Sequence, residues 1–437
     1  MSTLAINGGT PVRTKSFPRY RTIGEEEKEA ALRVLDRGIL SGFLGSWDAK
    51  FLGGPEVRAL EVEWQAYFDV KHAISVNSAT SGLYAAVGAA GIEPGDEVIV
   101  SPFTMSASAT AAIIYGGVPV FADIEEKYFC LDPRSVEERI TQRTKAIIVV
   151  DIFGQPYDAQ AIREIALKHH LIVIEDAAQA IGATYQGKFA GTLGDLGVFS
   201  LNVHKHIQCG EGGVVVTNDD ALANKIRLIR NHAEAVVGAK GESDITNMVG
   251  FNFRMTEIEA AMSRSQLHKL KTLLAQRLEH CAYLSSKLRN IPVICIPPVR
   301  PQSTHGYYVQ PFLFNDDHAQ GVTRDTFFNA VKAELAPTEG DEASGVSMGL
   351  GYCKPLYLQP MYQQQIAFGR GGYPFRGAHY NGKVRYEPGI CPVAERMYES
   401  DLVVSELMHP SLTTSDLDDI IRAFEKVWLH RSELTQA

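Results

Sequence analysis

Lys205 and Asp176 are the residues of this chain whose types and spacing point most directly to chemistry. Each follows a short apolar run in an α/β pattern, and each stands among small or short side chains. A desolvated lysine has a lowered pKa, and its neutral amine condenses with an aldehyde. A carboxylate against a pyridine nitrogen keeps that nitrogen protonated. The pair therefore predicts a pyridoxal phosphate site with Lys205 and Asp176 as catalytic residues, the alternatives being a surface lysine and a helix-capping aspartate.

The segment 77–82 supplies donors for a phosphate. It follows a strand-like run and opens a helical pattern, and helix N-termini offer free N–H groups and the positive end of a dipole. Ala79 and Thr80 are predicted to bind the phosphate there, and Ser200 adds a hydroxyl five residues before Lys205. Simple N-capping by serine or threonine explains the same residues, and both roles can coexist. Gln179 is predicted to hydrogen-bond the 3-oxygen of the cofactor ring.

His204 and His206 flank the lysine. A histidine beside a Schiff base can shuttle protons, but side chains at successive positions point apart. Positions on the substrate side or in solvent are therefore an equal alternative. No cysteine or third ligand stands at a metal-site spacing from these histidines, so no metal is expected.

The elements that must position these residues form a parallel α/β pattern. The apolar runs lack polar alternation, which is typical of strands covered on both faces by helices. They span residues 73–76, 97–100, 118–121, 146–150, 171–174, 197–199 and 213–216. Ligands of such sheets bind beyond the carboxyl ends of the strands, and Asp176 and Lys205 fall just past two of these runs. We predict a large domain over residues 1–265 around a mostly parallel seven-stranded sheet.

A second region follows the capping-box sequence Thr256-Glu-Ile-Glu259, which opens a long helical pattern that can bridge two domains. We expect a strand over residues 306–314, helices near 323–335 and 415–428, and a loop over the Gly-, Arg- and Tyr-rich residues 368–389. These elements predict a smaller C-terminal α+β domain over residues 266–437.

Composition excludes several classes of protein. The chain has 437 residues, 45% of them hydrophobic and 21% charged, with a formal net charge of -9, which argues against binding to nucleic acid or an anionic membrane. No apolar run approaches the ~18 residues of a membrane helix, and the N-terminus has no signal-peptide pattern. The six cysteines are scattered. We therefore expect a reduced cytoplasmic protein.

Five motifs in one order resemble the DegT/DnrJ/EryC1/StrS aminotransferases. They are Asn77–Gly82, Glu175–Gln179, Ser200 with Lys205, Gly210–Gly213, and Phe251–Glu257. The resemblance implies fold type I of the aspartate aminotransferases, with Lys205 bonded to pyridoxal phosphate and Asp176 against its ring nitrogen. It implies a homodimer with shared active sites, in which Thr80, Ser200 and Asn252 from the neighbouring subunit hold the phosphate. The implied reaction moves an amino group from glutamate or glutamine to a keto or aldehyde sugar, most often a nucleotide sugar or a cyclitol.

The chain departs from the family pattern at three places. Met105 stands where the family usually stacks an aromatic residue on the cofactor ring; a thioether can also pack there. Asp151 stands where many members carry histidine, and the segment 41–54 is longer than usual. The last two departures fall in regions that could touch the acceptor, so they favour a less common substrate.

Three other functions remain open at this stage. A cyclitol aminotransferase is the main alternative to a nucleotide-sugar aminotransferase. Some relatives are sugar dehydratases with histidine in place of the lysine, but here the five-residue interval from Ser200 ends on Lys205. A regulator that binds the cofactor without turnover would have no use for the electron sink that Asp176 provides.

Overall fold

Seven strands form the central sheet in the order β1-β9-β8-β5-β4-β2-β3. Their bounds are β1 (His72–Val76), β2 (Glu97–Val100), β3 (Val118–Phe121), β4 (Thr144–Val150), β5 (Ile172–Asp176), β8 (Leu196–Ser200) and β9 (Gly213–Thr217). Only β9 runs against both of its neighbours; the other adjacent pairs are parallel. The computed structural model describes residues 3–435, and it confirms the predicted seven-stranded, mostly parallel sheet.

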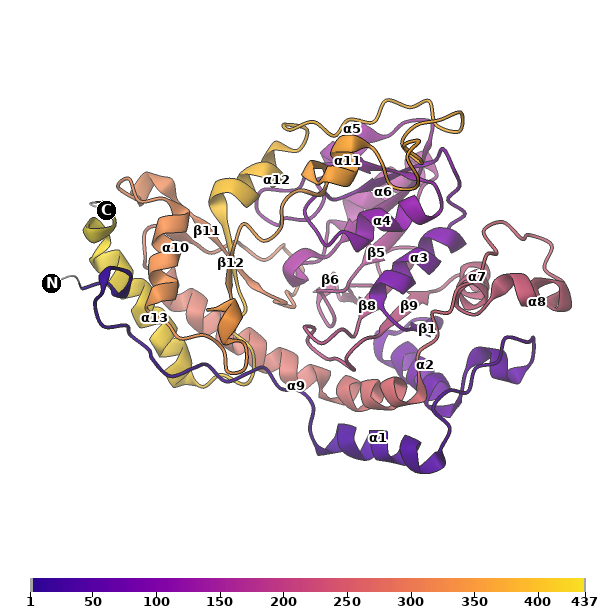
Figure 1. Ribbon diagram of the computed structural model, residues 1–437, viewed down its shortest axis with the longest axis horizontal. Coiled ribbons are helices and arrows are strands. Elements are labelled where there is room, and N and C mark those ends of the chain that lie inside the picture. Colours follow the sequence, from indigo (N-terminus) through magenta and orange to yellow (C-terminus); the bar gives the residue numbers. More distant parts are fainter. Residues whose placement is uncertain (1–2, 436–437) are drawn as a thin grey trace.

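Helices cover both faces of this sheet (Figure 1). They are α2 (Pro55–Phe68), α3 (Ala79–Ala89), α4 (Ala107–Ile114), α5 (Pro133–Arg139), α6 (Ala159–His169) and α7 (Asp220–Arg230). Helix α8 (Ala233–Lys240) packs on α7 and extends away from the sheet. Along β9 the buried valines alternate: Val214 and Val216 belong to one apolar cluster with Trp64 of α2, whereas Val215 belongs to another. Because successive strand residues point to opposite faces, a strand without polar alternation is buried on both sides.

Local sequence signals set the helix starts. Asp132 accepts a hydrogen bond from the N–H of Arg134 (2.9 Å), and Asp158 accepts one from Ala161 (3.1 Å). Such caps satisfy N–H groups that the first helical turn leaves free. The capping box predicted at Thr256 is confirmed and opens the 32-residue helix α9 (Glu257–Leu288).

A second, four-stranded antiparallel sheet follows α9 in the order β10-β11-β13-β12. Its strands are β10 (Ile294–Cys295), β11 (Gln310–Phe314), β12 (Met348–Leu350) and β13 (Leu402–Ser405), with helices α10 (Arg324–Ala333), α11 (Pro360–Gln364), α12 (Pro392–Arg396) and α13 (Thr414–Leu429). The described residues also form α1 (Glu25–Arg37), the short hairpin of β6 (Thr184–Tyr185) and β7 (Lys188–Phe189), and several short 3-10 segments in the connections. The second sheet and its helices confirm an α+β C-terminal part.

The expected strand over residues 306–314 is only half right. The sheet contains Gln310–Phe314 alone. The preceding residues leave it because the N–H groups of Gly306 and Tyr308 donate to the carbonyls of Gly154 and Phe153, at 2.7 and 2.8 Å. This segment therefore pairs with the loop after β4 instead of extending the small sheet.

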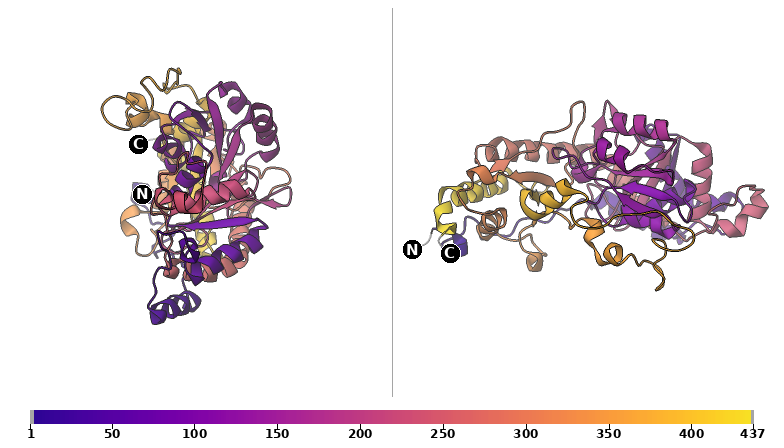
Figure 2. Two further views of the ribbon diagram at one scale, coloured as in Figure 1. Left: turned by 90° about the vertical axis from the view of Figure 1, so that its right-hand side faces the viewer. Right: turned by 90° about the horizontal axis from the view of Figure 1, so that it is seen from above.

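Helix α9 links the two sheets, with α1 packed beneath it (Figure 1). The first described residues return to the C-terminal part, where Arg13 pairs with Asp416 at 2.7 Å and the Ala5 N–H donates to Glu334 at 2.8 Å. Both ends of the described chain therefore lie at one end of an elongated molecule (Figure 2). The domain boundary near residue 265 stays a prediction, since it falls inside α9. In residues 3–435 no helix is long and apolar enough to cross a membrane.

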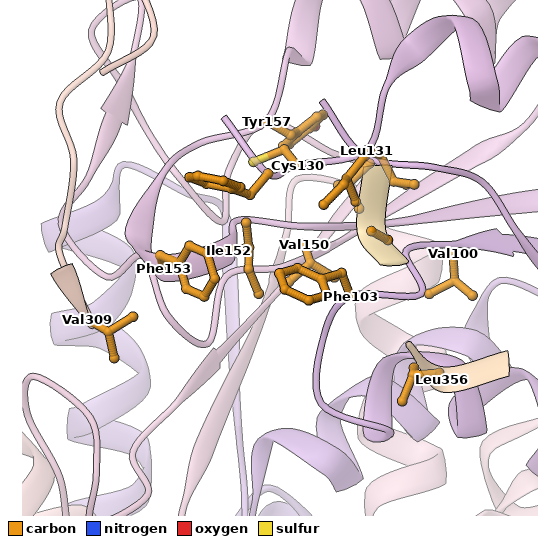
Figure 3. Close-up of a cluster of buried hydrophobic side chains, with 14 of the residues drawn as sticks. Val100, Phe103, Cys130, Leu131, Val150, Ile152, Phe153, Tyr157, Val309 and Leu356 are labelled. Carbon is orange, nitrogen blue, oxygen red and sulfur yellow. The ribbon is translucent and has the colours of Figure 1, made fainter. Parts of the chain in front are cut away.

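A buried apolar cluster underlies the carboxyl ends of β2 and β4 (Figure 3). Phe103 and Phe153 meet edge to face, with ring centroids 6.3 Å apart, next to the last residues of these strands. Val309 and Leu356 bring the C-terminal part into the same region. Close packing of these side chains fixes the loops that follow the two strands, and those loops border the candidate site.

Candidate active site

A cavity of about 370 Å³ opens beyond the carboxyl ends of β5 and β8. The predicted residues that line it are Ala79, Thr80, Met105, Asp176, Gln179, Ser200 and Lys205. The volume is within the range of sites for small molecules and cofactors. The fold thus brings together every predicted site residue except Asn252.

The loop between β8 and β9 carries Lys205 into the cavity. It folds back on itself because the Val203 N–H donates to the carbonyl of Gly210 at 2.9 Å. Gly210 has a φ of +91°, a conformation that side chains disfavour and glycine accepts readily. This turn explains why the sequence has a glycine at position 210, shortly after Lys205.

The amine of Lys205 is free to react. Its Nζ lies 4.2 Å from the centroid of the Tyr308 ring, and no residue among 3–435 accepts a hydrogen bond from it. Burial lowers the pKa of Lys205 to about 8, although the carboxylates of Asp176 and Glu406 oppose the shift. A neutral amine is the form that attacks a carbonyl, so burial prepares this side chain for that reaction.

Asp176, the last residue of β5, presents its carboxyl group to the same cavity. Oδ2 accepts a hydrogen bond from the Ser108 hydroxyl at 2.7 Å, and Oδ1 accepts one from the Ala178 N–H at 3.2 Å. Burial raises the pKa of Asp176, whereas these two donors and the charge of Lys205 lower it. The carboxyl group is thus held in one orientation, where it can face a cationic ring nitrogen.

The N-terminus of α3 forms the opposite end of the cavity. Ser78 caps it by accepting from the Ser81 N–H at 3.0 Å. The N–H groups of Ala79 and Thr80 have no acceptor in the described part of the chain. A Cβ on Gly213 would stand 2.8 Å from the Ala79 nitrogen, so only glycine lets β9 approach this turn. Free N–H groups at a helix start suit a phosphate.

Gln179 and Met105 occupy the wall between these two ends. Gln179 Oε1 accepts from the Phe153 N–H at 2.7 Å, and its Nε2 donates to the Tyr352 hydroxyl at 2.8 Å. One Nε2 hydrogen remains available to a bound ring. The bond from Gln179 to the 3-oxygen of the cofactor stays a prediction. Met105 is 66% exposed, which leaves its thioether available for stacking on a ligand.

The side chains of His204 and His206 point in different directions, as expected for residues at alternating positions. His204 lines the cavity, whereas His206 is buried and its Nε2 is 2.8 Å from the Gly306 carbonyl. Burial lowers the pKa of His206 well below the usual value. A buried neutral imidazole outside the cavity wall cannot exchange protons with a ligand there, so only His204 is placed to do so.

Asn252 does not line the cavity formed by its own chain. Its Oδ1 accepts from Arg254 Nε at 2.7 Å, and its carbonyl accepts from Asn77 Nδ2 at 3.2 Å. The residue is otherwise exposed. A role in a neighbouring subunit stays a prediction.

Sequence reasoning missed Ser108, which holds the Asp176 carboxyl group, and Tyr308 and Tyr352, which line the cavity. Ser108 stands in an Ala/Ser-rich helix with no distinguishing signal. The two tyrosines come from the C-terminal part, each close to a glycine, and Tyr308 also stands in an aromatic stretch. That aromatic composition could have marked Tyr308, whereas the sequence around Tyr352 has no such signal.

Known proteins are similar to this chain in sequence and in architecture. The profile of the DegT/DnrJ/EryC1/StrS aminotransferase family matches residues 45–425. The chain is 32% identical to the spore coat polysaccharide biosynthesis protein SpsC of Bacillus subtilis (strain 168), over 93% of this chain and 95% of that protein. It is 30% identical to the L-glutamine:2-deoxy-scyllo-inosose aminotransferase of Streptomyces lividus, over 99% of both chains.

A solved structure agrees over the whole fold. DesI, crystallised in the presence of its TDP-sugar product, superposes with a TM-score of 0.79 at 27% identity, covering 99% of this chain and 98% of that one. The predicted type I aminotransferase fold is therefore confirmed. The family profile spans most of the chain, and relatives of similar length match nearly end to end. This chain is an aminotransferase and belongs to the DegT/DnrJ/EryC1/StrS family.

Proposed function

We propose that the chain binds pyridoxal phosphate in this cavity and transfers an amino group from glutamine or glutamate to a keto sugar, one linked to a nucleotide. The proposal is carried by one observation: Lys205 and Asp176, an amine of lowered pKa and an oriented carboxyl group, face one cavity. The family is PLP-dependent, which agrees with this pair.

The donor set fits the cofactor at each end. When bound, pyridoxal phosphate supplies an aldehyde that accepts amines and a ring that withdraws electrons from the carbon being deprotonated. Asp176 would hold a proton on the ring nitrogen. Lys205, as a neutral amine, would take the proton from the donor's Cα and return it one step later as an acid. Met105 would pack on the ring face and Gln179 would bind its 3-oxygen.

The phosphate end has donors of two kinds. Ala79 and Thr80 offer backbone N–H groups at the start of α3, and Thr80 and Ser200 add hydroxyls in the same wall. A dianionic phosphate gains from both the hydrogen bonds and the helix dipole. Asn252 of the partner subunit would complete this set.

Two acceptor classes are supported by named relatives. DesI was solved with a TDP-sugar product, which favours a nucleotide-linked keto sugar. The Streptomyces lividus relative is named for an L-glutamine donor and 2-deoxy-scyllo-inosose, and it matches over 99% of both chains, which supports a cyclitol as the second candidate.

A homodimer is supported by exposed apolar side chains near Asn252. Ile39, Leu40, Leu44 and Trp47 are between 43% and 59% exposed. Asn231, which is bridged to Asn252, donates to the Leu44 carbonyl at 2.8 Å, so the apolar segment and Asn252 are neighbours. Monomers rarely leave such a patch in solvent, and a second copy would cover it.

Activity is tested with purified protein, L-glutamine or L-glutamate, and a panel of TDP-, GDP- and UDP-linked keto sugars plus scyllo-inosose derivatives. The protein should absorb as a bound pyridoxal chromophore, and one donor–acceptor pair should give an aminated product. Lys205→Ala should abolish both, while Lys188→Ala, at an exposed lysine, should change neither. Turnover by Lys205→Ala at the wild-type rate would refute the assignment.

The shared site is tested by mixing two inactive variants. Refolded or coexpressed Lys205→Ala and Asn252→Ala chains should regain about a quarter of wild-type activity, because half of the dimers are mixed and each of these holds one intact site. A fully monomeric active enzyme on dilution, or no recovery in a mixture proven to contain mixed dimers, would contradict the shared-site proposal.

A further inference from the structure

Two buried acids behind the cavity are not used by the proposed reaction. Asp151 follows β4, and Glu175 lies on the neighbouring strand β5, directly before Asp176. Neither Asp151 nor Glu175 has any exposed surface. Val149 pairs with Glu175 across the two strands, so Asp151, two residues further on, lies on the same face of the sheet as Glu175. Their carboxyl groups are close enough to interact directly.

The two carboxyl groups have unequal surroundings. Glu175 accepts three backbone hydrogen bonds, from the N–H groups of Gly191 (2.6 Å), Leu193 (2.8 Å) and Gly194 (3.1 Å). Asp151 accepts one, through Oδ1, from the Tyr157 N–H at 3.0 Å. Its Oδ2 is buried and has no hydrogen-bond partner in the described structure.

Two carboxylates in contact inside a protein cannot both stay charged unless a cation or a proton lies between them. In residues 3–435 no group of three or more His, Cys, Asp or Glu side chains could hold a metal ion. The arginines nearby in the sequence and fold are engaged elsewhere, Arg163 with Asp195 and Arg300 with Glu125. A shared proton is therefore the remaining way to neutralise the pair.

We propose that Asp151 is a neutral carboxylic acid whose Oδ2–H donates to a charged Glu175, and that this pair positions Asp176. The charge belongs on Glu175 because three N–H dipoles stabilise it there. The proton belongs on Asp151 because Oδ2 would otherwise be a buried oxygen without a donor.

The other ionisable groups that face Asp151 agree with this assignment. Burial and then the charge of Glu175 raise the pKa of Asp151 well above its usual value. Burial likewise raises the pKa values of Tyr157 and Cys130, so both stay neutral and neither supplies a positive charge. Asp176 is a third acid in the group, and its charge adds to the repulsion that keeps Asp151 protonated.

The pair fixes backbone that leads to the active site. The Asp151 carboxyl group, which accepts from the Tyr157 N–H, holds the loop after β4. This loop begins where the Asp151 N–H donates to the carbonyl of Asp176 at 3.1 Å. The turn 191–194 that is bound by Glu175 enters β8, the strand that ends at Ser200 before the Lys205 loop. A neutral Asp151 also spares Asp176 a second negative charge close by, which would raise its pKa further. Asp151 is thus a positioning residue and touches no substrate.

The proposal predicts an asymmetry between two isosteric variants of the holoenzyme. Asp151→Asn keeps a neutral group with an N–H donor toward Glu175, so Tm and kcat should stay at wild-type values. Glu175→Gln places an amide NH2 among three N–H donors, so Tm should fall by several degrees. Asp123→Asn is the matched control, since this largely buried aspartate accepts from the N–H groups of Ile124, Val393 and Ala394 and should also lose stability.

Infrared difference spectroscopy reads the proton directly. At neutral pH the wild type minus Asp151→Asn spectrum should contain the C=O stretch of a protonated carboxyl group, shifted by deuterium exchange. Absence of that band overturns the proposal, and so does an Asp151→Asn protein that is as destabilised as Glu175→Gln or fails to fold. Unchanged Tm in Glu175→Gln would also overturn it, because the charge would then not reside on Glu175.

Discussion

The lowered pKa of Lys205 can be measured without any turnover. Burial brings the pKa from 10.5 to about 8. At neutral pH a lysine of pKa 8 is roughly 10% neutral, whereas one of pKa 10.5 is roughly 0.03% neutral, a difference of about 300-fold in reactive amine. The amine should therefore gain reactivity about tenfold for each pH unit below 8 and level off above it.

Competitive acetylation of the cofactor-free protein measures this directly. Trace acetic anhydride is added between about pH 6 and about pH 11, and labelling of Lys205 is compared by mass spectrometry with that of the exposed Lys188. Half-maximal labelling of Lys205 is expected near pH 8. Because the Asp176 carboxylate raises this pKa, Asp176→Asn should move the midpoint to lower pH. A midpoint near pH 10 would refute the desolvation argument. An upward shift in Asp176→Asn would refute the electrostatic effect assigned to Asp176.

Two further substitutions test the two ends of the cavity. Ser108→Ala removes the 2.7 Å hydrogen bond to Asp176, so the pKa of that acid should rise, the acid limb of the pH–kcat profile should move to higher pH, and kcat should fall roughly 10- to 100-fold, as for a hydrogen bond to a charged group. An unchanged profile would show that the hydroxyl does not tune Asp176. Gly213→Ala should weaken cofactor binding in an absorbance titration, because its Cβ would stand 2.8 Å from the first turn of α3. Gly238→Ala in α8, whose Cβ would meet nothing within 4 Å, should bind normally.

Much of the large sheet could be predicted because its determinants are local. Caps at Asp132, Asp158 and Thr256 mark helix starts within a few residues. Continuous apolar runs mark strands that are buried on both faces. Lys205 and Asp176 could be placed in one site because parallel strands deliver their following residues to one edge. These inferences need no knowledge of contacts between distant segments.

The rest of the site depends on such contacts. Tyr308 reaches the cavity only because its segment leaves β11 and bonds to the loop after β4, and no pattern within residues 306–314 distinguishes that from a longer strand. Tyr352 is placed by a turn in which its own φ is +60°, a conformation that propensity argues against for tyrosine. Both positions depend on how the C-terminal part packs on the large sheet. The periodicity of the sequence carries no information about such contacts between distant segments.

The burial that makes the site hard to predict is also what makes it reactive. Desolvation disfavours charge of either sign, so it lowers the pKa of Lys205 and raises that of Asp176. The pKa of the amine is thereby brought closer to neutral pH, where a group can both accept and return a proton. Asp176 must nevertheless keep its charge to hold a proton on a ring, and Ser108 and Ala178 supply the hydrogen bonds that oppose its neutralisation. If Asp151 were also charged, its negative charge would raise the pKa of Asp176 and oppose the effect of those hydrogen bonds. The proton on Asp151 therefore matters for the site even though Asp151 does not line the cavity.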